Sequence, residues 1–134
     1  MRNQFDERWK AKGVMVTEPS RVTVDAMIGS GVEIGPFCEV GPAIIGNNVK
    51  IGPACFIFGK VSIGGDSDIG PRVTFESESK VGQGVTVGAS ATILRGVKIG
   101  DRAVIGAGSI VTKDVPPGET WAGNPAQKLD KRRK

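Results

Sequence analysis

The side chains that most often carry catalytic or metal-binding chemistry are scarce in this chain of 134 residues. It contains no histidine and only two cysteines, Cys38 and Cys55. Two cysteines without histidine exclude a histidine-ligated zinc site. The Gly-x-Gly pairs Gly82–Gly84 and Gly106–Gly108 are interpreted as punctuation of a repeat, not as a phosphate-binding loop. Without histidine, any proton transfer is left to carboxylates or to solvent.

The elements that must position a site come from a repeat of six residues. Each inward aliphatic or aromatic residue is followed, four positions later, by a small or β-branched one. A helix would space its apolar residues by three and four, and an ordinary strand by two. A period of six predicts short strands that each end at a corner, which is the hexapeptide parallel β-helix pattern. The main series is Ile51, Ile57, Ile63, Ile69, Phe75, Val81, Val87, Ile93, Ile99, Ile105 and Val111.

The same register begins near Val16, and one five-residue unit, VGPAI, interrupts it before Ile45. A residue deleted at a corner is tolerable, because only a shift within a strand would turn the side chains inside out. At three strands per coil, the sequence predicts an all-β fold of five to six triangular coils. Cys38 and Cys55 then lie one full coil apart and should stack as buried free thiols, each behaving as a small hydrophobe.

Three segments are expected along the chain. Residues 1–15 form an N-terminal segment, in which QFDERWKA predicts a short amphipathic helix with Phe5 and Trp9 on one face. Residues 16–115 form the β-helix. Residues 116–134 form a C-terminal loop cap followed by a basic tail.

Charge and hydropathy limit the partners. The net charge of +4 comes entirely from the tail, because the rest of the chain is balanced. A neutral body with a basic tail indicates a solvated terminus, and no nucleic-acid partner is expected. The sequence has no run of eighteen apolar residues and no secretory signal, so we expect a cytoplasmic protein that does not interact with membranes.

One column of corners changes character along the chain. The second position after the inward aliphatic is Pro36, Pro53 and Pro71, and then Ala89 and Ala107. Proline fixes φ and lacks a hydrogen-bond donor, so it suits a bend. Where alanine replaces it, the outer surface becomes shallower, which suggests a groove.

The segment GASATILRGVKIGDRAVIGAGSIVTKDVPPGETWAGNPA resembles the C-terminal coils of the hexapeptide-repeat acyltransferases. CFIFGKVSIGGDSDIGPRVTF resembles the central coils of their nucleotide-amino-sugar N-acetyltransferases. The resemblance implies a left-handed β-helix, a homotrimer, and acetyl-coenzyme A as co-substrate, without a metal, in a cleft between two prisms. It implies that Gly88, Ala89, Gly106 and Ala107 contact the thioester and pantetheine. Lys113 then contacts a phosphate of the coenzyme as a point charge.

The acceptor implied by this resemblance is an amino sugar, and the resemblance favours one that is linked to a nucleotide. A sugar hydroxyl depends heavily on a positioned base, whereas an amine already has a neutral fraction in water, so O-acetylation is the less favoured reaction. The carboxylates nearest the family's active region are Glu76 and Glu78, which are therefore the candidate bases. Backbone N–H groups at the Gly88–Ala89 corner would stabilise the developing oxyanion.

An alternative of another class remains open. VTFESESKVG runs into the next unit without the insertion that carries substrate contacts in the resembling enzymes. In this alternative, the chain is a non-catalytic assembly or binding module that has lost the histidine base and the substrate-binding loop. In either case Phe37, Phe56 and Phe58 fall outside the inward register, and exposed aromatic residues of this kind favour a trimer interface.

Overall fold

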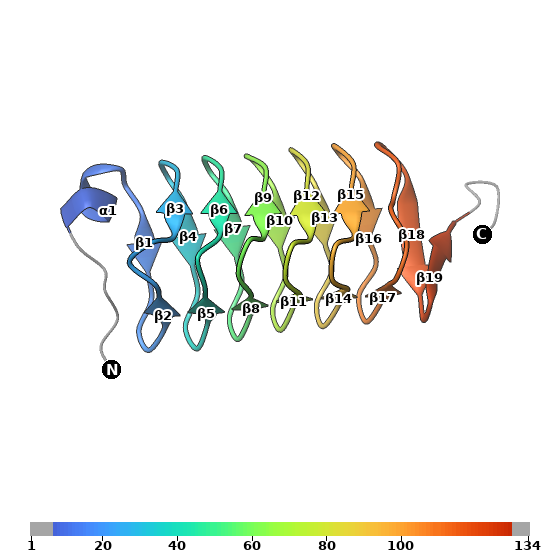
Figure 1. Ribbon diagram of the computed structural model, residues 1–134, viewed down its shortest axis with the longest axis horizontal. Coiled ribbons are helices and arrows are strands. Elements are labelled where there is room, and N and C mark those ends of the chain that lie inside the picture. The colour runs from blue at the N-terminus through green and yellow to red at the C-terminus, as the bar shows by residue number, and fades with distance from the viewer. Residues whose placement is uncertain (1–6, 130–134) are drawn as a thin grey trace.

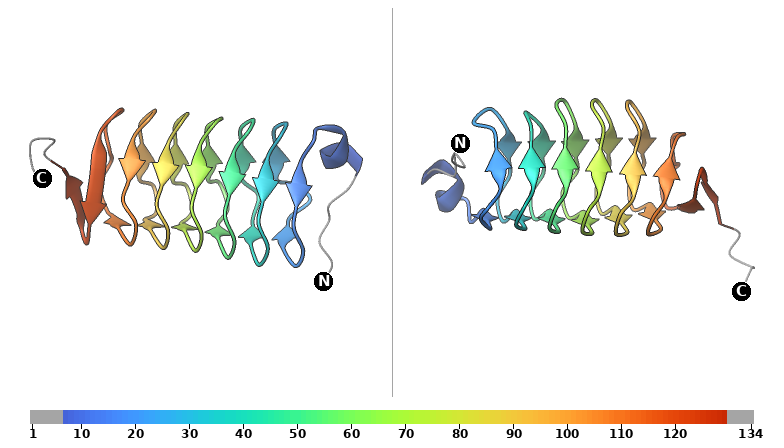
Figure 2. Two further views of the ribbon diagram at one scale, coloured as in Figure 1. Left: turned by 180° about the vertical axis from the view of Figure 1, so that it is seen from behind. Right: turned by 90° about the horizontal axis from the view of Figure 1, so that it is seen from below.

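The computed structural model describes residues 7–129, and over this range the chain winds into a three-sided β-structured prism (Figure 1). A single short helix, α1 (Glu7–Ala11), precedes the strands. The coils stack along one axis, so the two ends of the described chain lie at opposite ends of the prism (Figure 2). The short helix predicted around Trp9 is confirmed, while Phe5 lies outside the described residues.

The strands form three sheets, one on each side of the prism. Sheet A contains β1 (Met15–Val16), β4 (Glu33–Ile34), β7 (Lys50–Ile51), β10 (Asp68–Ile69), β13 (Thr86–Val87), β16 (Val104–Ile105), β18 (Thr120–Gly123) and β19 (Ala126–Lys128). Sheet B contains β2 (Arg21–Val22), β5 (Glu39–Val40), β8 (Phe56–Ile57), β11 (Thr74–Phe75), β14 (Thr92–Ile93) and β17 (Ile110–Val111). Sheet C contains β3 (Met27–Ile28), β6 (Ile44–Ile45), β9 (Ser62–Ile63), β12 (Lys80–Val81) and β15 (Lys98–Ile99).

The strand register follows the repeat. Ile69 pairs with Val87, eighteen residues later, in the parallel ladder of sheet A. Across the five-residue unit, Ile28 pairs with Ile45, seventeen residues later, so the shortened corner leaves every side chain on its proper face. The predicted left-handed parallel β-helix of five to six triangular coils is confirmed.

The core is a stack of the inward positions. In each two-residue strand from β2 to β17 the second side chain is buried, and the residue four positions later is buried as well, except in the five-residue unit after Val40, where Ala43 is buried and Ile44 points outward and is exposed. Phe75 is the largest fully buried side chain. The Cys38 and Cys55 thiols are free and buried, and lie one coil apart as expected, since Glu39 N donates to Cys55 O at 3.0 Å.

Three edges separate the sheets, and each is a column of short turns. The A–B edge contains residues 35–37, 52–54, 70–72, 88–90 and 106–108. The B–C edge contains residues 58–60, 76–78, 94–96 and 112–114. The C–A edge contains residues 46–48, 64–66, 82–84 and 100–102. Most of these turns place their third residue at a positive φ, even where that residue is not glycine, as in Ala54 (59°) and Ser90 (65°).

The C-terminal segment departs from the expected loop cap. β18 continues sheet A in parallel with β16, pairing Ile105 with Trp121. The chain then reverses, and β19 pairs antiparallel with β18. The segment therefore adds two strands to the end of the solenoid. Residues 130–134, which include most of the basic tail, lie outside the described residues.

Two inward serines differ in how their hydroxyls are satisfied. Ser67 Oγ donates to Gly82 O at 3.0 Å and accepts from Val85 N at 3.1 Å. Near Ser79, the backbone groups that correspond to Val85 N–H and Gly82 C=O are Val97 N–H and Leu94 C=O. These two are already bonded to each other, because Val97 N donates to Leu94 O at 3.1 Å. Among residues 7–129, Ser79 Oγ has no hydrogen-bond partner although the residue is fully buried.

Replacing these two serines should change stability in opposite directions. Ser79→Ala removes an unsatisfied buried hydroxyl and is expected to stabilise the fold by about 1 kcal/mol. Ser67→Ala leaves Val85 N–H without a partner and should destabilise it by about 1–3 kcal/mol. Urea denaturation of both variants at one protein concentration measures the two effects. Destabilisation by Ser79→Ala equal to that by Ser67→Ala would contradict the assignment.

Candidate active site

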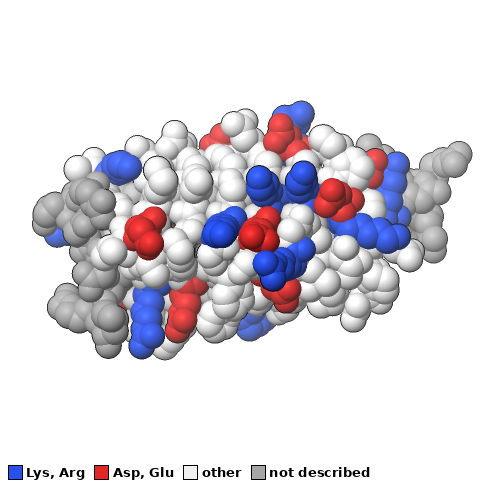
Figure 3. Space-filling model, in the orientation of Figure 1, with Lys and Arg blue, Asp and Glu red and all other residues white. Residues whose placement is uncertain are grey.

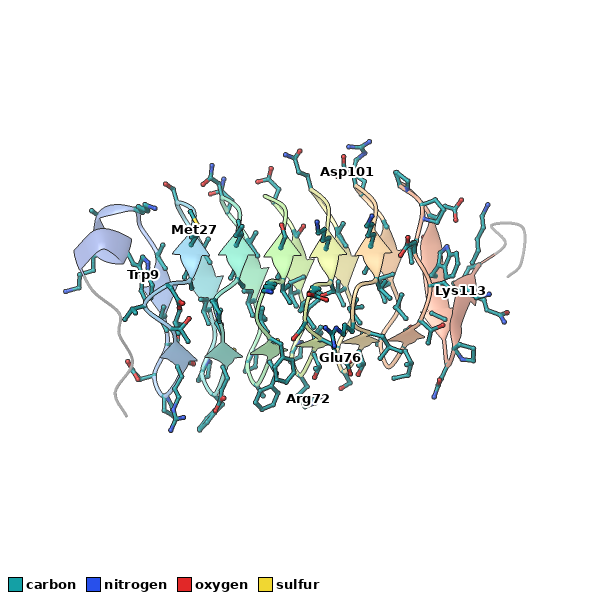
Figure 4. The ribbon with its side chains drawn as sticks, viewed as in Figure 1. Trp9, Met27, Arg72, Glu76, Asp101 and Lys113 are labelled. Atoms are coloured by element: carbon teal, nitrogen blue, oxygen red, sulfur yellow. The ribbon has the colours of Figure 1, made fainter. Side chains whose placement is uncertain are left out.

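The structure places the predicted site residues on two different edges of the prism. Glu76 follows β11 and Lys113 follows β17, so both lie on the B–C edge. In Figure 4 both lie at a height between Arg72 of the A–B edge, which is lower, and Asp101 of the C–A edge, which is higher, and Lys113 lies closer to the C-terminal end. The predicted coenzyme-contacting residues follow β13 and β16 and lie on the A–B edge. Within one chain, the width of sheet B therefore separates the two groups.

The backbone at the A–B edge offers two hydrogen-bond donors. Gly88 N donates to Ile105 O at 2.8 Å and Gly106 N to Trp121 O at 2.9 Å, so both glycine N–H groups are used in the ladder. Among the described residues, no hydrogen bond uses the N–H of Ala89 or Ala107. Of the two donors expected at the Gly88–Ala89 corner, only the Ala89 N–H is available. The Ala107 N–H in the next coil is a second available donor.

Gly88 itself has a structural explanation. A Cβ atom on Gly88 would lie 2.5 Å from Ala107 N in the next coil, which is closer than real contacts allow. The glycine thus permits the coils to stack and brings the Ala89 and Ala107 corners next to each other. The preceding coils have Pro53 and Pro71 at this position, and proline has no N–H. Along the described turns of the A–B edge, the two unpaired donors occur where alanine replaces proline.

The B–C edge holds the two carboxylates around an arginine. Glu76 Oε1 accepts from the backbone N–H of Arg95 at 3.2 Å. Glu78 Oε1 accepts from Arg95 Nε at 3.2 Å in a solvent-exposed ion pair. Both glutamates are half-buried, and one residue of the next coil therefore orients both carboxylates. Within residues 7–129, the Glu76 carboxylate is bonded only to a neutral amide, whereas that of Glu78 is paired with a cation.

Sequence reasoning missed Arg95. Arg95 comes nineteen residues after Glu76 and seventeen after Glu78, and one coil is eighteen residues long. The register of the predicted columns would have been sufficient to find it.

Lys113 lies one coil beyond Arg95 on the same edge and is exposed. No ion pair within residues 7–129 involves its side chain. Its neighbour Asp114 accepts a hydrogen bond from Lys98 N at 2.9 Å through Oδ1. The Lys113 ammonium is therefore available to an anionic ligand.

A groove of about 700 Å³ crosses the N-terminal part of sheet B. It is lined by Val24, Pro42, Phe56 and Phe58 among others, and the two phenylalanines are 43% and 48% exposed. Phe37, which is 66% exposed, lies on the A–B edge that borders the same sheet. The aromatic residues outside the inward register thus flank one side of the prism.

The buried thiols take no part in this site. Cys38 Sγ contacts Gly52 O at 3.1 Å and Cys55 Sγ contacts Gly70 O at 3.2 Å. The hydrogen bond with the Cys38 sulfur and burial raise the pKa of the Cys55 thiol, which keeps it protonated and unreactive at neutral pH. Within the described part of the chain, no cluster of three His, Cys, Asp or Glu side chains is arranged to hold a metal. No helix in that part is long and apolar enough to cross a membrane.

Comparison with known sequences gives a family match. Residues 25–59 and 78–113, together just over half of the chain, match the bacterial transferase hexapeptide family (six repeats). No curated protein matches the sequence.

Solved structures of the same fold include several acyltransferases. The acetyltransferase domain of PglB from Neisseria gonorrhoeae FA1090 superposes with a TM-score of 0.84 at 24% identity, covering 87% of this chain and 57% of that one. PerB from Caulobacter crescentus, in complex with CoA and GDP-perosamine, gives 0.84 at 23% identity over 87% and 58%. A variant of AntD, an N-acyltransferase from Bacillus cereus in complex with dTDP and coenzyme A, gives 0.73 at 20% identity over 98% and 92%.

The chain thus spans less than two thirds of PglB and PerB and nearly all of AntD. At these identities the likeness establishes the fold.

Proposed function

Because the chain belongs to the bacterial transferase hexapeptide family, we propose that it transfers an acetyl group from acetyl-coenzyme A to the amine of a sugar. The observation that carries the proposal is the pair of unpaired backbone N–H groups of Ala89 and Ala107, stacked in successive coils of the A–B edge. Acyl transfer requires preorganised donors where negative charge develops on oxygen.

These donors fit a pantetheine thioester. Bound acetyl-coenzyme A would supply the activated acyl group. Ala89 N–H donates to the oxygen on which negative charge develops, and Ala107 N–H donates to an amide carbonyl of the pantetheine arm. Lys113 provides a point charge for a phosphate of the coenzyme.

The acceptor side of the proposed site lies on the B–C edge. Glu76 has one carboxylate oxygen bonded to Arg95 N–H and keeps the capacity to accept a proton from an attacking amine. Glu78 is paired with the Arg95 guanidinium and positions Arg95, whose backbone N–H in turn orients Glu76. The protonated form of an amine titrates far below a sugar hydroxyl, so neutral, nucleophilic amine is already present in water, and a chain without histidine is suited to N-acetylation.

The separation of the two edges supports a homo-oligomer. One prism does not bring the Ala89 corner and Glu76 to the same edge, because sheet B lies between them. Two copies can bring them together, when the A–B edge of one faces the B–C edge of the next. We therefore propose a homotrimer in which each cleft is completed by a neighbouring copy, with the apolar groove on sheet B covered by that copy.

The ligands of two structures with the same fold support a proposal for the acceptor. PerB was solved with GDP-perosamine and CoA, and AntD with dTDP and coenzyme A. These ligands support a nucleotide-linked amino sugar as the acceptor.

A second candidate function rests on the turn at Glu76. β11 and β12 are joined by an ordinary corner in which Ser79 N donates to Glu76 O at 3.3 Å, with no inserted loop. That corner suits a non-catalytic scaffold equally well. Stabilisation of the folded protein by coenzyme A separates the two, since a ligand that binds only the native state raises the melting temperature.

The reaction is tested with amino sugars, free and nucleotide-linked, and with their hydroxyl counterparts in the presence of acetyl-coenzyme A. We expect acetylation of amines only. The rate should rise with pH as the neutral amine accumulates, without an inflection near about 6.5 from an imidazole.

Glu76→Gln keeps an oxygen that can accept from Arg95 N–H but removes the base. Since the amine can also release its proton to solvent, turnover should fall by less than the about hundredfold expected for an essential general base. Turnover restricted to hydroxyl acceptors would overturn the assignment to amines. Failure of every acceptor, together with failure to bind coenzyme A, would favour the scaffold.

A further inference from the structure

Two lysines lie directly opposite each other on the outer surface of sheet C. Lys80 of β12 pairs with Lys98 of β15 in the parallel ladder, and both side chains are exposed. Neighbouring strands are about 4.8 Å apart, so the two ammonium groups can converge on one small ligand. Their inward neighbours Val81 and Ile99 are buried and fix both strands.

The fold does not require this pair. Like charges directly opposite each other in a sheet are unfavourable. The outer positions of sheet A show the opposite arrangement, in which Lys50 pairs with Glu33 on one side and Asp68 on the other. Within residues 7–129, no ion pair involves Lys80 or Lys98.

A shallow hollow of about 370 Å³ lies at this pair. Gly82 and Gly100 line it and have no side chains to fill it. Asp114 also lines it, with Oδ1 accepting from the backbone N–H of Lys98 at 2.9 Å, so the lining contains two lysines and one carboxylate. In Figure 3, several Lys and Arg side chains lie close together over the middle coils of the visible face, interspersed with Asp and Glu, and charged side chains are fewer over the N-terminal coils.

We propose that Lys80 and Lys98 bind the diphosphate group of a small molecule in this hollow. A diphosphate places negative charge on two adjacent phosphoryl groups, which matches two ammonium groups on neighbouring strands. Lysine is an effective point-charge ligand for phosphate. Binding would relieve the repulsion between the lysines. The proposal does not depend on acetyl transfer, because it concerns binding alone.

The test measures pyrophosphate binding by calorimetry at fixed ionic strength, with Lys80→Ala, Lys98→Ala and Lys50→Ala. The first two variants should weaken binding about tenfold, as expected for losing a hydrogen bond to a charged group. Lys50→Ala is the matched control, since it removes a lysine from an outer strand position with acidic neighbours, and it should bind as the unaltered protein does. Circular dichroism confirms that each variant is folded.

Coenzyme A and GDP both carry a diphosphate, so measuring the binding of each one shows which kind of molecule supplies the diphosphate. A loss of affinity for either ligand in Lys80→Ala and Lys98→Ala, but not in Lys50→Ala, supports the site and identifies the molecule that uses it. Equal pyrophosphate binding by all three variants overturns the proposal. So does equal weakening by Lys50→Ala, which would indicate a general charge effect. Neither outcome depends on whether any acceptor is acetylated, so this proposal can fail separately from the proposed enzyme activity.

Discussion

Replacing Ala89 with proline should lower acetyl transfer about a hundredfold, the typical effect of losing one donor to a developing oxyanion. The change removes the N–H of Ala89, which has no partner among the described residues. Ala107→Pro removes the second donor. Because that donor is proposed to contact only pantetheine, it should weaken coenzyme binding by about three- to tenfold with a smaller effect on turnover.

The fold should tolerate both substitutions. Pro71 occupies the position of Ala89 one coil earlier, and the following residues, Arg72 and Ser90, have similar φ values of 58° and 65°. The contacts with the preceding coil also correspond. A Cβ on Gly52 would lie 2.8 Å from Pro71 N, and one on Gly70 would lie 3.0 Å from Ala89 N.

Steady-state kinetics with saturating acetyl-coenzyme A, together with thermal melts, measures these effects. Pro71→Ala is the matched control, because it creates an N–H at the same edge one coil away and should leave turnover unchanged. Full activity of Ala89→Pro would show that the Ala89 donor has no role in the reaction.

Truncating Phe75 to alanine should destabilise the fold by about 3–5 kcal/mol. Phe75 is fully buried and stacks between Ile57 and Ile93 in neighbouring coils of sheet B. In a solenoid each coil contacts only its neighbours, so a cavity in one coil weakens the interfaces on both sides of it.

The effect is measured as the change in the urea midpoint at one protein concentration. Phe75→Leu retains most of the volume and should cost less than about 1.5 kcal/mol. Thr74→Ala lies on the outer side of the same strand and should change stability by less than about 0.5 kcal/mol. A loss below about 1 kcal/mol for Phe75→Ala would mean that the neighbouring coils collapse into the space.

The sequence was sufficient to predict the three columns of the prism, because one inward pattern repeats at a fixed interval. Even the short unit before Ile45 was located correctly, since the register resumes there without turning a strand over. The same columns already assign Glu76 to one edge and Gly88 to another. The separation of the candidate site residues was therefore present in the sequence pattern.

Other features depend on coordinates that no periodicity encodes. β18 and β19 follow no six-residue pattern: pairing with Val104–Ile105 defines β18, and antiparallel pairing with β18 defines β19. Whether Gly88 or Ala89 has an available N–H depends on which carbonyl the next coil presents. The satisfied hydroxyl of Ser67 and the unsatisfied one of Ser79 likewise differ only in the backbone bonds of the coil above.

The reversal from β18 to β19 has a consequence for how copies can meet end to end. A stack of parallel strands is a template on which another chain could continue, and such open edges lead to fibres. Here the last strand of sheet A runs opposite to the others, so a second copy cannot extend the parallel ladder in register. At the opposite end, α1 places the buried Trp9 against the core beside the first coil. In-register growth of sheet A is thus opposed at the C-terminal end and α1 lies over the first coil at the other, which favours association through the sides of the prism.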